Sequence, residues 1–234
     1  LTKRVPYLTT VMGRAVVNGL QGPEADYYKL HACLKHFAIH SGPEYERHIF
    51  NVEEMSWRDL SETYLYAFER LVKTTDVKEV MCAYNAYEGK PCCGSDKLLI
   101  QILREQWGFD GLVVTDCWAV RDFHTEGCHN IFPNDPASAS AMSVRSGADL
   151  ECGNSYPALV EAVKNGIIPE EELDRALRRV LKARFELGEM DPQSKVKWSK
   201  IPVDLLACDE HHELSLKMAR ETMTLLQNNG SVLP

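Results

Sequence analysis

Four short apolar runs, each followed by polar residues and then by a helical segment, are the feature that most constrains the fold of this chain. The runs begin near residues 32, 78, 112 and 148, and each is continuous rather than alternating apolar with polar residues. Continuous apolar runs are typical of strands that are buried on both faces of a parallel sheet. The recurring order of strand, loop and helix therefore predicts an α/β fold with a parallel sheet.

Turn and capping residues set the expected bounds of these elements. Ser56 and Ser95 stand at N-cap positions, Gly166 follows the end of a helix, and Pro169 opens the next one. The expected strands span residues 30–40, 77–84, 112–116 and 148–151. The expected helices span residues 9–21, 57–74, 96–107, 137–147, 156–165, 169–188 and 205–228.

Composition excludes several classes of protein. The 234 residues include 26 Lys and Arg against 34 Asp and Glu, a net charge of −8 with no basic run, so we expect no nucleic-acid partner. No apolar run approaches the roughly 18 residues of a membrane-spanning helix, and the first residues do not resemble a signal peptide. The eight cysteines form no CxxC pair and no histidine has zinc-finger spacing, so we expect no metal site.

Four strands do not close a barrel. An eight-stranded (β/α) barrel needs about 250 residues, and a sheet of four strands leaves two open edges. We therefore expect an incomplete barrel of the TIM type, about the second half of one. Its edges should be covered by self-association or by pairing with the missing part of the barrel.

Polar residues follow each expected strand, at the edge where parallel sheets bind ligands. Each has a structural reading beside a functional one. Asp116 is either a turn or helix-cap residue or a nucleophile or general base. Lys35 and His36 form a satisfied polar pair or a binding pair, and Lys35 alone could form a Schiff base. Tyr84 is a core aromatic residue or a ligand contact, and Arg47 is solvated or a ligand contact. Together they predict a site for an uncharged, polyhydroxylated ligand.

Three segments of the sequence together resemble a known protein family. The chain contains CLKHFAIHSGPEYERHIFN, VMCAYNAYEGKPCCGS and LREQWGFDGLVVTDCWAV in that order. In this combination they resemble glycoside hydrolase family 3, particularly its β-xylosidase and β-glucosidase members. The resemblance spans nearly the whole chain. It implies a retaining hydrolase that cleaves O-glycosyl bonds and needs no metal or organic cofactor.

The resemblance assigns roles to individual residues. It implies that Asp116 is the nucleophile, and that nearby positive charges favour its ionised form. The substrate-binding residues that it implies are Lys35, His36, Arg47, Met81, Tyr84, Cys117 and Trp118. The TDC segment at 115–117 resembles the β-xylosidase branch. We expect Cys93 and Cys117 to lie close together and to narrow the pocket where a hexose would place its hydroxymethyl group.

The family also implies parts that this sequence does not match. Its acid/base glutamate stands in a second domain, and the local substitutes to consider are Glu44, Glu46, Glu88 and Glu151. We expect residues 1–205 to be a partial (β/α)8-type catalytic domain that begins partway through the barrel. Residues 206–234 would be a C-terminal helix and the start of a linker to an absent second domain.

Three functions remain open from the sequence. The first is a β-xylosidase or β-glucosidase that acts on a β-linked oligosaccharide or an aryl glycoside. The second is a truncated, non-catalytic remnant that binds sugar weakly or not at all, because the general acid contributes roughly 10² to 10⁴ in rate. The third is a Schiff-base aldolase that uses Lys35. The resemblance implies a secreted or periplasmic location.

Overall fold

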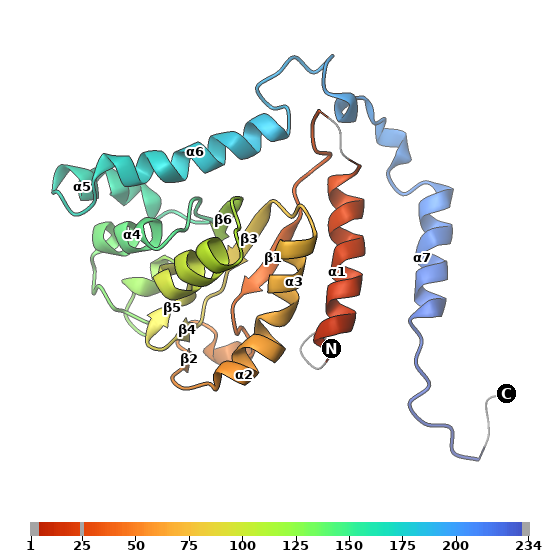
Figure 1. The fold of residues 1–234 in the computed structure, drawn as a ribbon, viewed down its shortest axis with the longest axis horizontal. Helices are drawn as coiled ribbons and strands as arrows, with labels where there is room; N and C mark the ends of the chain where they lie inside the picture. Colours follow the sequence, from red (N-terminus) through yellow and green to blue (C-terminus); the bar gives the residue numbers. More distant parts are fainter. Residues whose placement is uncertain (1–4, 24–25, 231–234) are drawn as a thin grey trace. The chain divides into compact units, whose positions relative to one another are not determined.

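Three parallel strands form the centre of the larger of two units in the chain (Figure 1). The computed structural model describes residues 5–23 and 26–230, and the units are Leu1–Pro192 and Gln193–Pro234. The strands are β1 (Cys33–Phe37), β3 (Glu79–Cys82) and β6 (Leu112–Thr115), in the order β1-β3-β6. All pairs are parallel, which confirms the α/β fold with a parallel sheet that the apolar runs predict.

The fourth expected strand is only partly present. Residues 148–151 form no strand, and a single parallel bridge joins Leu150 to Val114 of β6. Three backbone hydrogen bonds join this segment to β6: the amide of Thr115 donates to the carbonyl of Leu150, and the amides of Asp149 and Leu150 both donate to the carbonyl of Val113. The prediction of a full strand was wrong because the chain leaves the sheet at Cys152, where it turns toward the next helix.

A second, smaller sheet lies within the segments that follow β1 and β3. Its strands are β2 (Asn51–Val52), β4 (Ala86–Tyr87) and β5 (Lys90–Pro91). Strand β2 pairs with β4 in parallel, and β4 pairs with β5 as an antiparallel hairpin. Residues 85–94, expected as a loop, therefore contain this hairpin and a short 3-10 turn, Cys92–Gly94.

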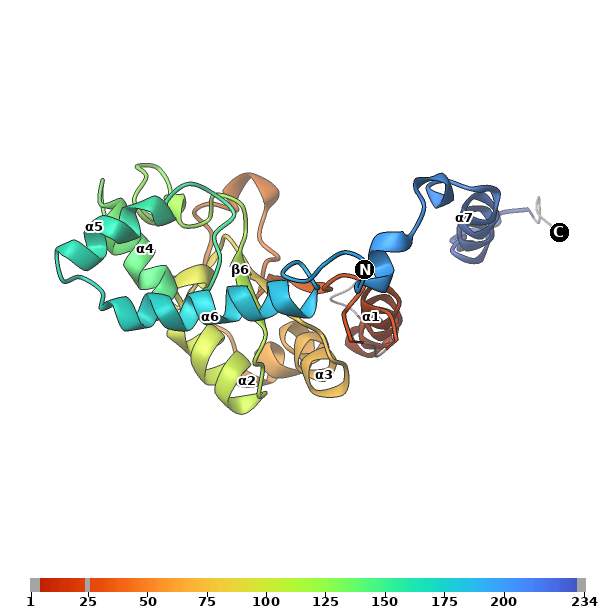
Figure 2. The same cartoon turned by 90° about the horizontal axis from the view of Figure 1, so that it is seen from above.

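Helices connect the strands and pack beside them (Figures 1 and 2). The α-helices of the larger unit are α1 (Pro6–Gln21), α2 (Trp57–Asp59), α3 (Tyr66–Thr74), α4 (Pro136–Arg145), α5 (Leu159–Lys164) and α6 (Glu170–Glu186). Two π-helical segments are Leu60–Tyr64 and Lys97–Gln106. Shorter 3-10 turns are Glu44–Glu46, Arg121–Phe123 and Tyr156–Ala158. Helix α1 begins three residues before the expected start, at Pro6, whose missing N–H suits the first helical position.

Side-chain caps begin several helices where the sequence indicates them. The hydroxyl of Ser56 accepts the amide N–H of Asp59 at 3.1 Å. Ser95 accepts the amide of Leu98 at 3.3 Å, so both predicted N-cap residues bond the first turn of a helix. Asp135, which precedes Pro136, caps α4 in the same way through the amide of Ser138.

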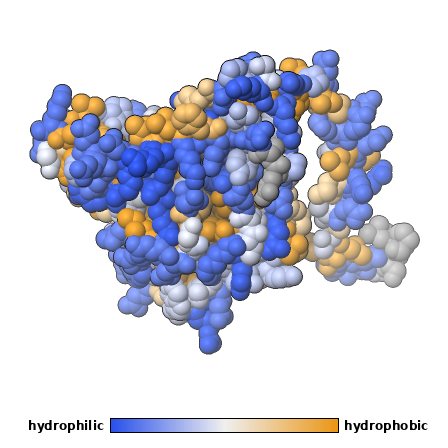
Figure 3. All heavy atoms as spheres, turned by 45° about the horizontal axis from the view of Figure 1, so that its top comes forward, coloured by the Kyte–Doolittle hydropathy of each residue, from blue (hydrophilic) through white to orange (hydrophobic). Residues whose placement is uncertain are grey.

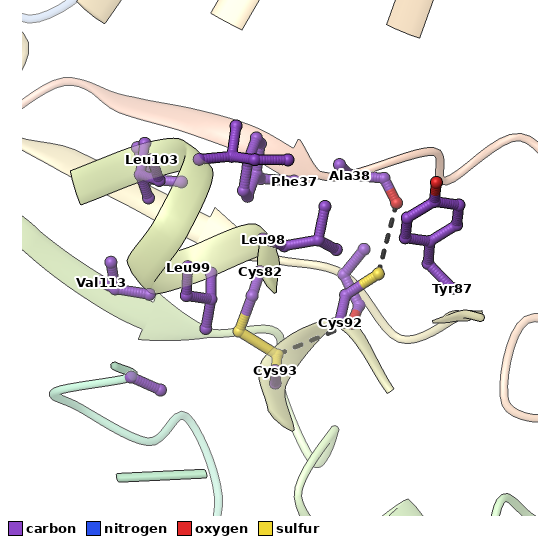
Figure 4. Close-up of a cluster of buried hydrophobic side chains, with 14 of the residues drawn as sticks. Phe37, Ala38, Cys82, Tyr87, Cys92, Cys93, Leu98, Leu99, Leu103 and Val113 are labelled. Carbon is purple, nitrogen blue, oxygen red and sulfur yellow. Dashed lines mark hydrogen bonds between the residues drawn. A yellow bond between two sulfur atoms is a disulfide. The ribbon is translucent and has the colours of Figure 1, made fainter. Parts of the chain in front are cut away.

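One face of the central sheet is covered and forms the core. Phe37, Val80 and Val113 are fully buried there and pack against leucines of the helix Lys97–Gln106 (Figure 4). The Phe37 ring meets Trp107 edge to face, with centroids 5.7 Å apart. Because alternate residues of a strand point to opposite faces, this burial leaves Met81 and Val114 together on the other face, where both are half-buried.

Exposed apolar side chains border both edges of the central sheet. Helix α1 packs against α3, yet Leu8, Met12 and Val16, four residues apart along one stripe, are about half exposed. Helix α6 exposes Leu177 and Phe185 in a similar stripe. Figure 3 shows apolar side chains, in orange, among the hydrophilic ones on the face that it draws.

The smaller unit contains two 3-10 turns, Lys197–Lys200 and Val203–Leu205, and helix α7 (Asp209–Glu221). Helix α7 is shorter than the expected 205–228 at both ends, and none of its residues is buried. Within residues 5–23 and 26–230, no helix is both long and apolar enough to cross a bilayer.

Candidate active site at the carboxyl ends of the strands

Asp116 directly follows β6 and is the centre of the candidate site. Its backbone N–H donates to the carbonyl of Cys82, which extends the pairing with β3 and fixes the backbone. One carboxylate oxygen, Oδ1, accepts the amide N–H of Cys117 at 2.9 Å. The other, Oδ2, is buried and has no hydrogen-bond partner in the described part of the chain. Burying a carboxylate oxygen without a hydrogen-bond partner costs free energy, and a bound ligand that donates to it would offset that cost.

Lys35 and His36 lie near the end of β1, and His36 adjoins Asp116. The Nε2 atom of His36 lies 3.4 Å from Oδ2 of Asp116. Burial lowers the pKa of His36, and the charge of Asp116 opposes that effect. Lys35 is exposed, and no described carboxylate lies within ion-pair distance of its ammonium group. The structure thus places the His36 ring beside the carboxylate.

Tyr84, two residues after the end of β3, contacts the residue that follows Asp116. Its hydroxyl donates to the carbonyl of Cys117 at 2.5 Å, so it is tied to the residue that follows Asp116. Burial raises the pKa of Tyr84, and the charge of Asp116 raises it further. The Arg47 guanidinium lies 5.3 Å from the centre of the Tyr84 ring, within cation–π range.

Trp118 and Met81 complete the set of predicted residues. Trp118 has φ of 70°, a left-handed conformation that bulky side chains rarely adopt, and its amide donates to the carbonyl of Cys152 at 2.7 Å. Its side chain is 47% exposed. A strained backbone beside the carboxylate is typical of functional sites. Met81 lies on the same face of the sheet as Val114, and Val114 precedes Asp116 by two residues.

The cysteine hypothesis was wrong. The prediction was that Cys93 and Cys117 narrow a pocket together, but each is held in a different disulfide, Cys82–Cys93 and Cys117–Cys152. Cys93 is fully buried in the core on the covered side of the sheet, where it cannot narrow an open pocket (Figure 4). Cys117 instead links the end of β6 to the end of the neighbouring bridge segment. Sequence spacing alone cannot distinguish among the pairings of eight cysteines.

The local glutamates differ in their suitability as an acid/base. Glu151 accepts the backbone amides of Ser155 and Tyr156 at 2.7 to 3.0 Å, so it caps a helical turn. Glu88 binds Lys97 with both oxygens at 2.7 Å, and this partner lowers its pKa. Glu44 pairs with Arg47 at 2.5 Å and is largely exposed. Glu88 and Glu151 are thus committed to other partners.

Asp149, another acidic residue at a strand end, has a structural role. It is buried between two guanidinium groups, at 2.7 Å from Arg104 and 2.8 Å from Arg179. Its Oδ2 also accepts the amide of Val113 at 2.9 Å. With this many donors, neither oxygen of Asp149 is free for chemistry, and its loss would leave both guanidinium groups without their carboxylate partner.

Sequence reasoning missed three residues that surround Tyr84 and Arg47. His48 packs its ring edge-on to Tyr84, with centroids 4.8 Å apart, and His129 bonds the carbonyl of Tyr84 at 2.8 Å. Burial lowers the pKa of His129. Asp122 bonds His48 across 74 residues of sequence. The one sequence signal for any of these three residues was that His48 directly follows Arg47. No cluster of three or more metal-ligating side chains occurs among the residues with described positions.

Comparisons with known proteins identify the family. Residues 3–183 match the family model described as the glycosyl hydrolase family 3 N terminal domain. A xylan 1,4-beta-xylosidase from Xylanibacter ruminicola is 50% identical over 232 residues, which are 98% of this chain and 27% of that protein. Beta-D-xylosidase 1 from Arabidopsis thaliana is 32% identical over 98% of this chain and 30% of its own length.

Solved structures agree in fold. A β-glucosidase from Erythrobacter marinus superposes with a TM-score of 0.85 at 31% identity, over 98% of this chain and 30% of that one. A family 3 exo-β-xylosidase in complex with a xylobiose aziridine probe superposes with a TM-score of 0.86 at 27% identity, over 97% of this chain and 30% of that one. The chain thus spans less than a third of the length of these relatives. The match to the family model covers most of the sequence, and the chain belongs to glycosyl hydrolase family 3.

Proposed function

We propose that this chain carries the nucleophile half of the active site of a retaining β-xylosidase, with Asp116 as the nucleophile. The observation that carries the proposal is the Asp116 carboxylate at the end of β6. Its Oδ1 accepts one backbone hydrogen bond, and its buried Oδ2 faces Nε2 of His36 at 3.4 Å without a hydrogen-bond partner among the described residues. In the first step a carboxylate oxygen attacks the anomeric carbon, a C–O ester bond forms, and the aglycone leaves with the electron pair of the glycosidic bond. Water then hydrolyses the ester and restores the original anomeric configuration.

The surrounding donors suit a sugar at this position. Lys35, His36 and Arg47 can donate hydrogen bonds to sugar hydroxyls, and the exposed Trp118 offers an apolar ring face. The Tyr84 hydroxyl lies beside Cys117 and can shift its bond as charge leaves Asp116. The curated relatives include proteins named for β-xylosidase activity, which favours β-linked xylo-oligosaccharides or aryl xylosides as substrates.

We further infer that the sheet is about half of a TIM-type barrel. Strand β1 has an unpaired edge among the described strands, and the opposite edge ends in the bridge at Leu150. An apolar hollow of about 420 Å³ borders that second edge, between Leu150 and Leu177. Both edges would be covered by further barrel strands or by a second copy of the chain. In this reading residues 1–205 are the partial catalytic domain and residues 206–234 lead toward a second domain.

Two disulfides support a secreted or periplasmic location, because disulfides persist in oxidising compartments. The non-catalytic alternative also has an observation in its favour. Glu88 and Glu151 are bound to other groups, so neither is free to protonate a leaving group. A chain without that acid would act on activated substrates only.

A 2-deoxy-2-fluoro β-xyloside with a dinitrophenolate leaving group tests the proposal. The good leaving group removes the need for a general acid, and the fluorine slows hydrolysis of the ester, so the intermediate accumulates. Intact mass and peptide mapping should show one adduct, on Asp116. The matched control is Asp110→Asn at the opposite end of β6, where the carboxylate is exposed, and it should label normally.

Two results would contradict the proposal. One is an adduct on another residue, or labelling that survives in Asp116→Asn. The other is the absence of an adduct from folded wild-type protein, which would favour the non-catalytic alternative. Comparing the xyloside with the matching glucoside identifies the preferred sugar.

A further inference from the structure

Three side chains from two distant loops form a continuous hydrogen-bonded chain beside Tyr84. The Nε–H of Arg47 donates to Nε2 of His48 at 3.0 Å. The Nδ1 atom of His48 lies 2.7 Å from Oδ2 of Asp122. We call Arg47, His48 and Asp122 the relay. Exposure decreases along it, since the Arg47 and His48 side chains are 41% and 38% exposed and that of Asp122 is 5% exposed.

The direction of these bonds determines the tautomer of His48. An arginine Nε–H can only donate, so Nε2 of His48 must present its lone pair. The ring proton therefore resides on Nδ1, where it donates to the Asp122 carboxylate. A carboxylate that selects the tautomer of a histidine in this way also fixes the orientation of the ring.

Asp122 is the rigid end of the relay. It lies on the 3-10 turn Arg121–Phe123, six residues after Asp116, and the adjacent Phe123 is buried in the core. The Asp122 carbonyl accepts the amide of Asn130, and the Phe123 carbonyl accepts the amide of Phe132. Arg47, in contrast, follows the short turn Glu44–Glu46, and its other partner is the exposed Glu44.

We propose that Asp122 and His48 are positioning residues that hold Arg47 in the orientation in which it binds the sugar. This inference rests on the proposed function, since it gives Arg47 the role of a sugar contact. The relay holds the Nε side of the guanidinium, whose central carbon lies 5.3 Å from the centre of the Tyr84 ring, while one terminal nitrogen donates to the exposed Glu44. A surface pair such as Arg47–Glu44 contributes little, so a sugar hydroxyl can replace Glu44. The buried carboxylate, not Glu44, supplies the orientation.

The first experiment reads the tautomer and needs no sugar. Long-range ¹H–¹⁵N correlation of the imidazole rings in the full chain, assigned with His48→Ala, should show the His48 proton on Nδ1 at neutral pH. Asp122→Asn should reduce the Nδ1–H population, because the charge that selects it is gone. A wild-type His48 that carries its proton on Nε2 would overturn the relay, whatever the outcome with sugars.

The second experiment measures labelling of Asp116 against the concentration of the fluoroxyloside. Asp122→Asn and His48→Ala should each raise the half-saturating concentration about tenfold, with little change in the rate at saturation. His48 is partly exposed, so His48→Ala keeps the test valid if Asp122→Asn does not fold. The control Glu44→Gln, which removes the exposed partner of Arg47, should change the half-saturating concentration less than about twofold.

A double-mutant cycle separates positioning from general damage to the fold. In an Arg47→Ala background, His48→Ala should have almost no further effect on half-saturation, because the residue that it positions is absent. An equal effect in both backgrounds would overturn the proposal. If wild-type protein shows no label at all, the proposed function fails, while the imidazole spectra still decide whether the relay exists.

Discussion

Cys117 joins the candidate nucleophile to a disulfide: its amide N–H donates to Oδ1 of Asp116 at 2.9 Å, and its sulfur is bonded to Cys152. Its carbonyl also accepts the hydroxyl of Tyr84. The backbone of Cys117 therefore binds both the Asp116 carboxylate and the Tyr84 hydroxyl, and its side chain ties both to the segment that contains Cys152. The disulfide closes a loop of 35 residues and limits movement of this residue.

Removing this disulfide should reduce both stability and labelling. The variant Cys117→Ala/Cys152→Ala should lose about 3 to 4 kcal/mol of unfolding free energy, because the unfolded chain regains the entropy of the loop. Urea unfolding measures the loss, and fluoroxyloside labelling of Asp116 should become slower. Cys33→Ala, at a free and half-buried cysteine, is the control and should change neither quantity appreciably. Equal stability of the double variant and the control would contradict the prediction.

Acid should destabilise the chain below about pH 6.5. Burial places the pKa of His36 and of His129 below the ordinary value of 6.5 in the folded state. The folded chain therefore binds fewer protons than the unfolded chain as pH falls through that value, and the free energy of unfolding decreases. The Tm should fall between pH 7.5 and pH 5.5, and His129→Gln should show a smaller fall. If the Tm of His129→Gln falls as much as that of the wild type between pH 7.5 and pH 5.5, His129 does not contribute to the acid destabilisation.

Asp149→Asn should destabilise the fold strongly. The substitution leaves two guanidinium groups, of Arg104 and Arg179, beside a neutral amide, and Arg104 is itself mostly buried. The expected loss is about 3 to 5 kcal/mol in urea unfolding. Asp110→Asn, which removes an exposed pair with Lys182, should cost less than about 1 kcal/mol. Similar losses for the two variants would show that the buried network contributes no more than a surface pair.

The chain should self-associate when it is studied alone. Sedimentation velocity over a range of concentrations should show species larger than the monomer, because no described strand pairs with the outer edge of β1 and the α1 stripe is exposed. Met12→Glu in that stripe should shift the distribution toward monomer, whereas Arg58→Glu, at a largely exposed position, should not. A monodisperse wild-type monomer would contradict the incomplete-barrel interpretation.

Local signals account for the parts of the fold that were predicted well. The apolar runs at 33–37, 79–82 and 112–115 are strands, and Ser56 and Ser95 cap helices, because these features depend on neighbouring residues alone. The segment at 148–151 is only a bridge, because the chain leaves the sheet at Cys152 before it forms a longer ladder with β6. Helix α7 is likewise shorter than its apolar pattern suggests.

The amino-acid sequence by itself determined the parallel α/β class, the family and the polar residues at the strand ends. Each of these follows from residue type and spacing along one segment. Only the tertiary structure decided which distant groups meet: Cys117 with Cys152 rather than Cys93, Asp149 with two arginines, and His48 with Asp122 across 74 residues. Those contacts depend on how loops and helices from distant parts of the chain pack against one another. Spacing along the chain carries no information on that packing.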